Sequence, residues 1–139
     1  MSTTIFEFID NSGAFKKELQ NKLPKILEML GLQAEGYAQL ELESNPRRVD
    51  TGNLRNSISH AKDENAAYVG TNVDYAIYVH EGTGKYAVGG GGRQTPWRYQ
   101  DDEGNWHTTT GMLPNRFLRN AVEKHTEEYK QIIKSEMQA

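Results

Sequence analysis

Two short motifs in this sequence have the residue types of catalytic or phosphate-binding sites. The first, Asp50-Thr51-Gly52, matches the aspartic-protease triplet, whose chemistry needs two carboxylates about 3 Å apart that share a proton. In such proteases the triplet follows an apolar strand, whereas here Arg47-Arg48 stands just upstream. We therefore interpret Asp50 as a turn cap for the following amides, and we keep a small aspartic hydrolase built from a homodimer as the least favoured alternative.

The second motif, Gly82-Thr83-Gly84-Lys85, resembles the end of a phosphate-binding loop. The full pattern needs a glycine five positions before Gly84 and a serine or threonine after the lysine, and Val79 and Tyr86 occupy those places. A dinucleotide-binding reading also fails, because the glycine run at residues 89–92 prevents the helix that must follow. The sequence therefore predicts no nucleotide cofactor and no catalytic residue.

Metal binding is not predicted either. The four histidines (His60, His80, His107 and His125) are scattered, and His80-Glu81 lacks the second histidine of a helical zinc motif. The chain has no cysteine, which excludes disulfides and thiolate ligands. We expect a structural or solvent-exposed role for each histidine.

Cations and aromatic rings alternate between residues 85 and 99, as in surfaces that bind single-stranded nucleic acid. The acidic run Asp101-Asp102-Glu103 follows at once, and the chain as a whole has a net charge of −3. Exposed rings beside a glycine-rich loop more often mark a protein–protein contact. We therefore favour a protein interface and keep a single-stranded nucleic-acid-binding module as the main alternative. The alternating residues are Lys85, Tyr86, Arg93, Trp97, Arg98 and Tyr99.

The elements that must position these residues begin with a helical region at residues 12–43. Apolar residues recur there at three- and four-residue steps from Phe15 to Ala38, after a short strand at residues 4–9 and a helix cap at residues 10–12. Pro24 lies inside this run and removes one backbone donor. We predict one helix that ends near Lys22 and a second that has Pro24 in its first turn, with a single kinked helix as the alternative.

The sequence predicts a core hairpin and a following segment over residues 54–81. Strands are predicted at residues 55–62 and 66–71 across Asp63-Glu64-Asn65. Residues 74–81 are ambiguous, because their β-branched and aromatic content favours a strand while the spacing of Tyr75, Tyr78 and Val79 permits two helical turns.

Residues 82–111 form a mobile loop and a hairpin in our prediction. Six glycines between residues 82 and 93 cannot hold a fixed conformation unaided. The aromatic-rich arms at residues 95–100 and 105–110 flank the acidic turn and predict a projecting hairpin. An apolar stripe then predicts one C-terminal helix over residues 114–137.

These elements predict a single α+β domain over residues 1–139, with an antiparallel sheet packed against N-terminal and C-terminal helices. Hydrophobic residues make up 36% of the chain, which allows one modest core and leaves much surface for loops and contacts. The N-terminal residues lack the pattern of a signal peptide, and no apolar run is long enough for a membrane span. We expect a soluble protein that starts in the cytoplasm.

Three sequence blocks follow the helical start in a fixed order: residues 49–58 (VDTGNLRNSI), 69–84 (VGTNVDYAIYVHEGTG) and 113–121 (LPNRFLRNA). Together they resemble the tail-completion family, the neck or head–tail joining proteins of long-tailed bacteriophages and prophages. The segments around the acidic turn, TPWRY and Trp106-His107, resemble an insertion that many members carry between the second and third blocks. The third block departs at Arg116 and Asn120, where members often have prolines.

The resemblance implies a non-enzymatic virion protein that forms a six-fold ring at the head-proximal end of the tail. Its expected partners are copies of itself, the tail tube protein and the head-closure protein, with transient contact to passing DNA. It would assemble in the host cytoplasm and reside in the virion neck, with no membrane contact. Since aromatic residues dominate such contacts, we predict as interface anchors Tyr75, Tyr78, Trp97, Tyr99 and Trp106, with core packing of Tyr75 and Tyr78 as the alternative.

Overall fold

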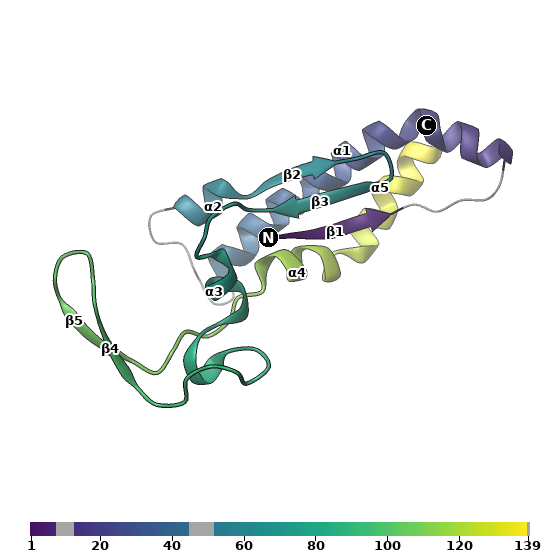
Figure 1. Cartoon of the computed structure of the whole chain (residues 1–139). Coiled ribbons are helices and arrows are strands. Elements are labelled where there is room, and N and C mark those ends of the chain that lie inside the picture. Colours follow the sequence, from purple (N-terminus) through teal and green to yellow (C-terminus); the bar gives the residue numbers. More distant parts are fainter. Residues whose placement is uncertain (8–12, 45–51, 139) are drawn as a thin grey trace.

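A long N-terminal helix packs along a small antiparallel sheet, and a thin hairpin projects from one end of this body (Figure 1). The computed structural model describes residues 1–7, 13–44 and 52–138, and the predicted α+β class is confirmed there. The predicted helix cap at residues 10–12 and the proposed turn cap Asp50 lie outside the described residues.

Helix α1 (Gly13–Ser44) is continuous and contains Pro24. The predicted break near Lys22 is therefore wrong, and the single-helix alternative holds. A proline costs one intrahelical hydrogen bond, but the apolar stripe keeps its helical phase on both sides of it. Burial of that stripe outweighs the local loss. Its fully or nearly fully buried members near the proline are Leu19, Leu23, Ile26, Leu27 and Leu30.

The main sheet has the order β1-β3-β2, with β3 (Ala66–Gly70) pairing antiparallel to both neighbours. β1 (Ser2–Glu7) confirms the predicted N-terminal strand as far as Glu7, and its register shifts between Thr4 and Phe6. β2 (Ser59–Lys62) forms the predicted hairpin with β3. Helix α1 packs against β2 and β3, so the core lies between this helix and the sheet.

The hairpin turn is held by Asp63, whose Oδ1 accepts the amides of Asn65 and Ala66, both at 2.8 Å. The preceding residues differ from the prediction. Helix α2 (Asn53–Ser57) occupies the place where we expected the strand to begin. Gly52 has a φ of 83°, and its carbonyl accepts the Asn56 amide at 2.8 Å, which winds this segment into a helical turn.

Helix α3 (Ala76–Glu81) resolves the ambiguous segment in favour of helix. Its buried residues, Ala76, Val79 and His80, are spaced three and four apart, as on one helical face. The 3-10 helix η1 (Gly84–Tyr86) follows, and then β4 (Trp97–Gln100) and β5 (Trp106–Thr109) form the predicted second hairpin.

The single C-terminal helix that we predicted is wrong, because α4 (Phe117–Glu123) and α5 (Thr126–Gln138) are separated at Lys124 and His125. The Tyr129 hydroxyl donates to the Ala121 carbonyl across this break, and the His125 ring stacks on Tyr37 of α1 at 3.5 Å. Both helices contact α1. The turn therefore lets the apolar stripe follow α1 instead of diverging from it.

Candidate protein interaction site

The root of the projecting segment is a narrow crossing of two backbone limbs. We call residues 82–111 the arm, and its root is the part around Thr83 and Met112. The Thr83 amide donates to the Met112 carbonyl at 2.9 Å, and the Met112 amide donates back to the Thr83 carbonyl at 3.3 Å. A further bond joins the Lys85 amide to the Thr110 carbonyl at 3.1 Å. The arm therefore leaves the body and returns to it at one point.

Glycine is required at this crossing. A Cβ on Gly84 would lie 2.1 Å from the Thr110 carbonyl oxygen, and one on Gly111 would lie 2.1 Å from the Thr83 oxygen. Both glycines also have positive φ, 63° and 126°. Any side chain here would push the limbs apart.

The glycine-rich part of the arm is more fixed than its composition suggested. The Val88 amide donates to the Glu81 carbonyl at 2.8 Å, so the loop folds back on the end of α3. Gly92 packs against Gly84, because a Cβ on Gly92 would lie 2.1 Å from the Gly84 oxygen. Tertiary contacts thus supply the order that the sequence lacks locally, although Gly89 and Gly90 border open space.

Beside the root, α3 presents an apolar outer face. Tyr75, Ile77 and Tyr78 are 44%, 53% and 60% exposed, whereas the opposite face of the helix is buried. The exposure of Tyr75 and Tyr78 disagrees with the core-packing alternative, and their role as interface anchors stays a prediction. Ile77 was not selected in the sequence analysis, because an aliphatic residue in a segment rich in β-branched and aromatic residues is expected to lie in the core.

The hairpin carries rings on both faces. Tyr99 and His107 are directly opposite in the register and stack at 5.2 Å on one face. On the other face the Arg98 guanidinium lies 5.1 Å from the centre of the Trp106 ring. Trp106 is 59% exposed, and Figure 1 shows the hairpin extending away from the body. No sheet or helix of the described chain covers either face, which is costly for a two-stranded hairpin in water.

The remaining anchor, Trp97, is half-buried and lies under the Arg93 guanidinium at 5.7 Å. The structure therefore separates the five proposed anchors into two patches. Tyr75 and Tyr78 belong to α3 at the root, and the other three belong to the hairpin. Tyr86, one of the alternating rings and cations of the sequence analysis, is also exposed near the root. Val88 and Leu113, which the sequence analysis did not select, are exposed there as well.

The turn of the hairpin is organised by Asp101. Its Oδ1 accepts the amides of Glu103 at 3.0 Å and Asn105 at 2.8 Å, and its Oδ2 contacts His107 Nε2 at 2.6 Å. The hydrogen bond from His107 and those from the backbone hold the pKa of Asp101 below its ordinary value. Asp102 and Glu103 are exposed at the end of the turn.

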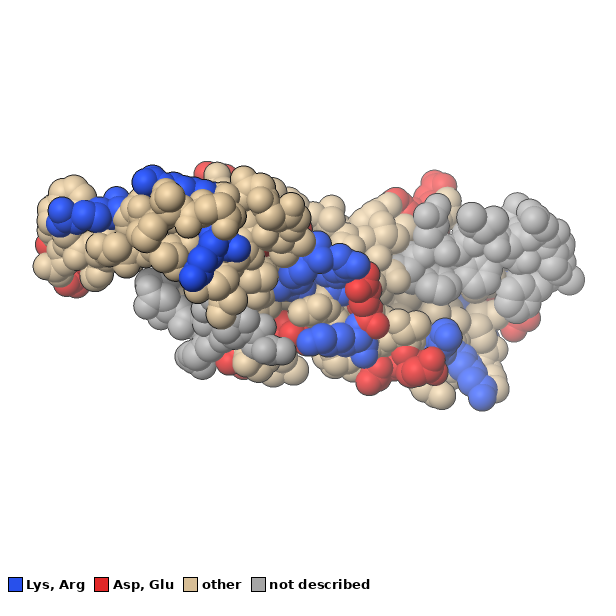
Figure 2. Space-filling view, turned by 90° about the horizontal axis from the view of Figure 1, so that it is seen from below, with Lys and Arg blue, Asp and Glu red and all other residues tan. Residues whose placement is uncertain are grey.

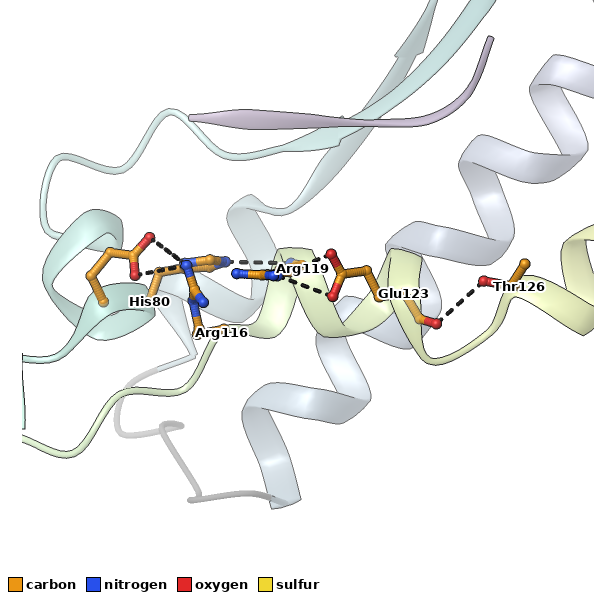
Figure 3. A network of polar contacts seen from close by, with 6 residues as sticks. His80, Arg116, Arg119, Glu123 and Thr126 are labelled. Atoms are coloured by element: carbon orange, nitrogen blue, oxygen red, sulfur yellow. Dashed lines mark hydrogen bonds and ion pairs between the residues drawn. The ribbon is translucent and has the colours of Figure 1, made fainter. Parts of the chain in front are cut away.

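A polar network fixes the root to the body (Figure 3). His80 Nε2 accepts the Arg119 amide at 3.3 Å and so caps the first turn of α4, while its Nδ1 contacts Glu81 Oε1 at 3.3 Å. Arg116 pairs with Glu81 at 3.2 Å. Burial lowers the pKa of His80 despite the adjacent Glu81, and Arg116 and Arg119 act in the same direction as burial. His80 is therefore neutral, with its proton on Nδ1.

Asn115 completes the attachment of the root. This buried residue donates its backbone amide to the Val79 carbonyl at 2.9 Å and its side-chain Nδ2 to the Glu41 carbonyl of α1 at 2.8 Å. Helix α3, the returning limb and the end of α1 are thus joined through one residue.

The other residues weighed for chemistry have structural surroundings. His60 of β2 contacts Glu28 at 2.7 Å and Glu35 at 3.3 Å on α1. Lys85 lies within the three-residue η1, and no helix that could bind phosphate follows it. Across residues 1–7, 13–44 and 52–138, no three histidine or acidic side chains come close enough together to hold a metal ion.

None of the helices in the described parts of the chain has the length and apolarity needed to cross a membrane. Comparisons with protein-family models, with curated proteins and with solved structures return no significant match.

Proposed function

We propose that this chain is a virion structural protein of a long-tailed phage or prophage, a tail-completion subunit that acts as one copy in a ring joining tail to head. The observation that carries the proposal is the arm. It leaves a packed body through a glycine crossing and exposes rings on two faces with no cover of its own. Rings in this setting are suited to docking on other proteins.

The positions of the three sequence blocks support this proposal. The first and second blocks meet where the Ser57 and Thr71 hydroxyls share a hydrogen bond of 2.6 Å. The second and third meet at the root, through the bond from the Asn115 amide to the Val79 carbonyl and the bond from the Arg119 amide to His80 Nε2. The segments that resemble the tail-completion family therefore build one region, the support from which the arm projects.

The body and the arm have the properties that a ring subunit needs. A rigid core holds each copy, and an arm that reaches beyond it can make the heterologous contacts by which identical subunits close a ring. In the proposed hexamer, six copies at −3 carry a charge of −18, which would repel DNA phosphates from a channel. The partners in this proposal are sister copies, the tail tube protein and the head-closure protein.

The arrangement of cations on the arm favours a protein partner over single-stranded nucleic acid. Arg93 and Arg98 lie over the rings of Trp97 and Trp106, so a guanidinium occupies a ring face on which a base would stack. A filter-binding assay at low salt separates the two functions. Micromolar binding that disappears in a Trp97→Ala, Arg98→Ala variant would favour the nucleic-acid reading.

The decisive experiment is genetic. Deletion of the gene from its phage or prophage is expected to leave filled heads and free tails that do not join, as seen by electron microscopy. Normal virions from the deletion would refute the proposal. Complementation with a Tyr99→Ala, Trp106→Ala variant is expected to fail, whereas Leu32→Ala, an exposed change on α1, serves as the control.

A further inference from the structure

The charges of the arm are separated along its length. Residues 82–111 contain three cations and three carboxylates, and all three carboxylates (Asp101, Asp102 and Glu103) lie in the hairpin turn. Two of the cations, Lys85 and Arg93, lie at the opposite end, since Gly92 packs on Gly84 and brings their neighbours to the root. The third, Arg98, lies in β4 over the Trp106 ring. In Figure 2 the arm is on the left, and its visible face shows Lys and Arg among uncharged side chains.

In the described parts of the chain, exposed charged side chains at both ends of the arm have no ion-pair partner. Asp101 is engaged in the turn, but Asp102 and Glu103 make no ion pair. At the root, Lys85 and Arg93 also make no ion pair, and they contact rings, hydroxyls and a carbonyl instead. By contrast, most described cations of the body are paired with a carboxylate, among them Arg55, Arg116, Arg119 and Lys124.

These two ends cannot meet within one molecule. The paired strands β4 and β5 hold the turn away from the root, and each strand residue adds about 3.3 Å to that separation. The acidic turn of one arm and the basic root of another are, however, complementary in sign. A contact between them would be heterologous, with a different surface used on each side.

We propose that the acidic turn of the arm, Asp102 and Glu103, docks on the basic root, Lys85 and Arg93, of a second copy of this chain. This contact rests on the proposed function and identifies the surfaces through which sister subunits join head to tail. The contact would also cover the Trp97 ring of the hairpin, since this ring lies against Arg93 of the basic root. Each molecule then offers one acidic turn and one basic root to its neighbours, as a closed ring requires.

Charge reversal tests the contact. The turn variant carries Asp102→Lys and Glu103→Lys, and the root variant carries Lys85→Glu and Arg93→Glu; all four side chains are exposed. At low ionic strength the wild type is expected to self-associate in sedimentation velocity, and added salt should weaken it. For each variant alone, the association constant is expected to fall on the order of 10-fold or more. An equimolar mixture is expected to restore association, because each reversed end then meets an opposite charge.

Three results would overturn the contact: a wild type that stays monomeric at millimolar concentration and low salt, variants that associate like the wild type, or a mixture that restores nothing. A control variant, Glu127→Lys on the exposed surface of α5, should associate like the wild type. Since the chain has no cysteine, Glu103→Cys and Gln94→Cys proteins provide a second measurement, and they should form a disulfide-linked heterodimer on mixing. Self-association combined with normal virions from the deletion would refute the proposed function and leave this contact standing.

Discussion

His60 and His80 have opposite electrostatic roles in the same domain. Burial opposes the charge on His60, but the hydrogen bonds that its ring donates to the Glu28 and Glu35 carboxylates prevail and raise its pKa above 6.5. Burial dominates at His80 and lowers its pKa below 6.5, so its Nε2 remains free to accept the Arg119 amide. The contacts of His60 between β2 and α1 favour its charged form, whereas His80 caps α4 through its neutral form.

Replacement of His80 by leucine is expected to destabilise the fold by about 1–3 kcal/mol, because the Arg119 amide loses its partly buried acceptor. His80→Gln is the matched variant, since its side-chain oxygen can accept near the position of Nε2, and it should lose less. Urea denaturation of both variants measures the difference. Equal stability of His80→Leu and wild type would show that the cap contributes nothing.

The two histidines should also give opposite pH dependences. Below pH 6.5 the unfolded chain protonates at the position of His80 while the folded chain does not, so acid removes stability there. The contribution of His60 is fully present below pH 6.5 and is lost as the pH rises through its raised folded pKa.

Unfolding free energies between pH 5 and pH 9 test these signs. His80→Gln should reduce the loss of stability on acidification, and His60→Gln should make that loss steeper. If both variants change the slope in the same direction, one of the two assignments is wrong.

Among the elements, glycine is required where the two backbone limbs of the arm cross, and not wherever glycines are frequent in the sequence. Gly84 and Gly111 allow two backbone segments to touch, whereas a Cβ on Gly36 of α1 would meet nothing within 4 Å. The same residue type is thus indispensable in the arm and unfavourable in a helix interior.

Gly84→Ala is expected to open the root, because the new Cβ would clash with the Thr110 carbonyl oxygen. Hydrogen exchange should then speed up at the amides of Lys85 and Met112, which bond across the crossing. Gly36→Ala is the control and should stabilise the protein by about 0.5–1 kcal/mol through helix propensity. Unchanged exchange in Gly84→Ala would mean that the crossing tolerates a side chain.

For the whole molecule, the body should fold without the arm. Thr83 and Met112 are already bonded to each other, so a two-residue Asn-Gly turn can replace residues 84–111 without stretching either limb. Thermal unfolding of the shortened chain is expected to stay within a few degrees of the wild type, on the order of 1 kcal/mol. The same chain should fail to restore head–tail joining. A chain that does not fold would show that the arm contributes to the core.

Elements whose signals are local could be predicted from the amino-acid sequence. The apolar stripe of α1, the Asp63 turn between β2 and β3 and the acidic turn between β4 and β5 were all predicted, because hydrophobic period and turn chemistry depend on neighbouring residues. The aromatic candidates Tyr75, Tyr78, Tyr99 and Trp106 were also selected from composition, and their exposure agrees with a surface role.

Features that depend on contacts between residues distant in sequence could not be predicted in this way. The passage of α1 through Pro24, the break between α4 and α5 and the order of the glycine-rich loop each follow from packing against another element. The cap that His80 places on α4 joins residues 39 positions apart, and no local pattern encodes it. Long-range packing and hydrogen bonding can outweigh a proline or a run of glycines, and that balance is visible only once the chain is folded.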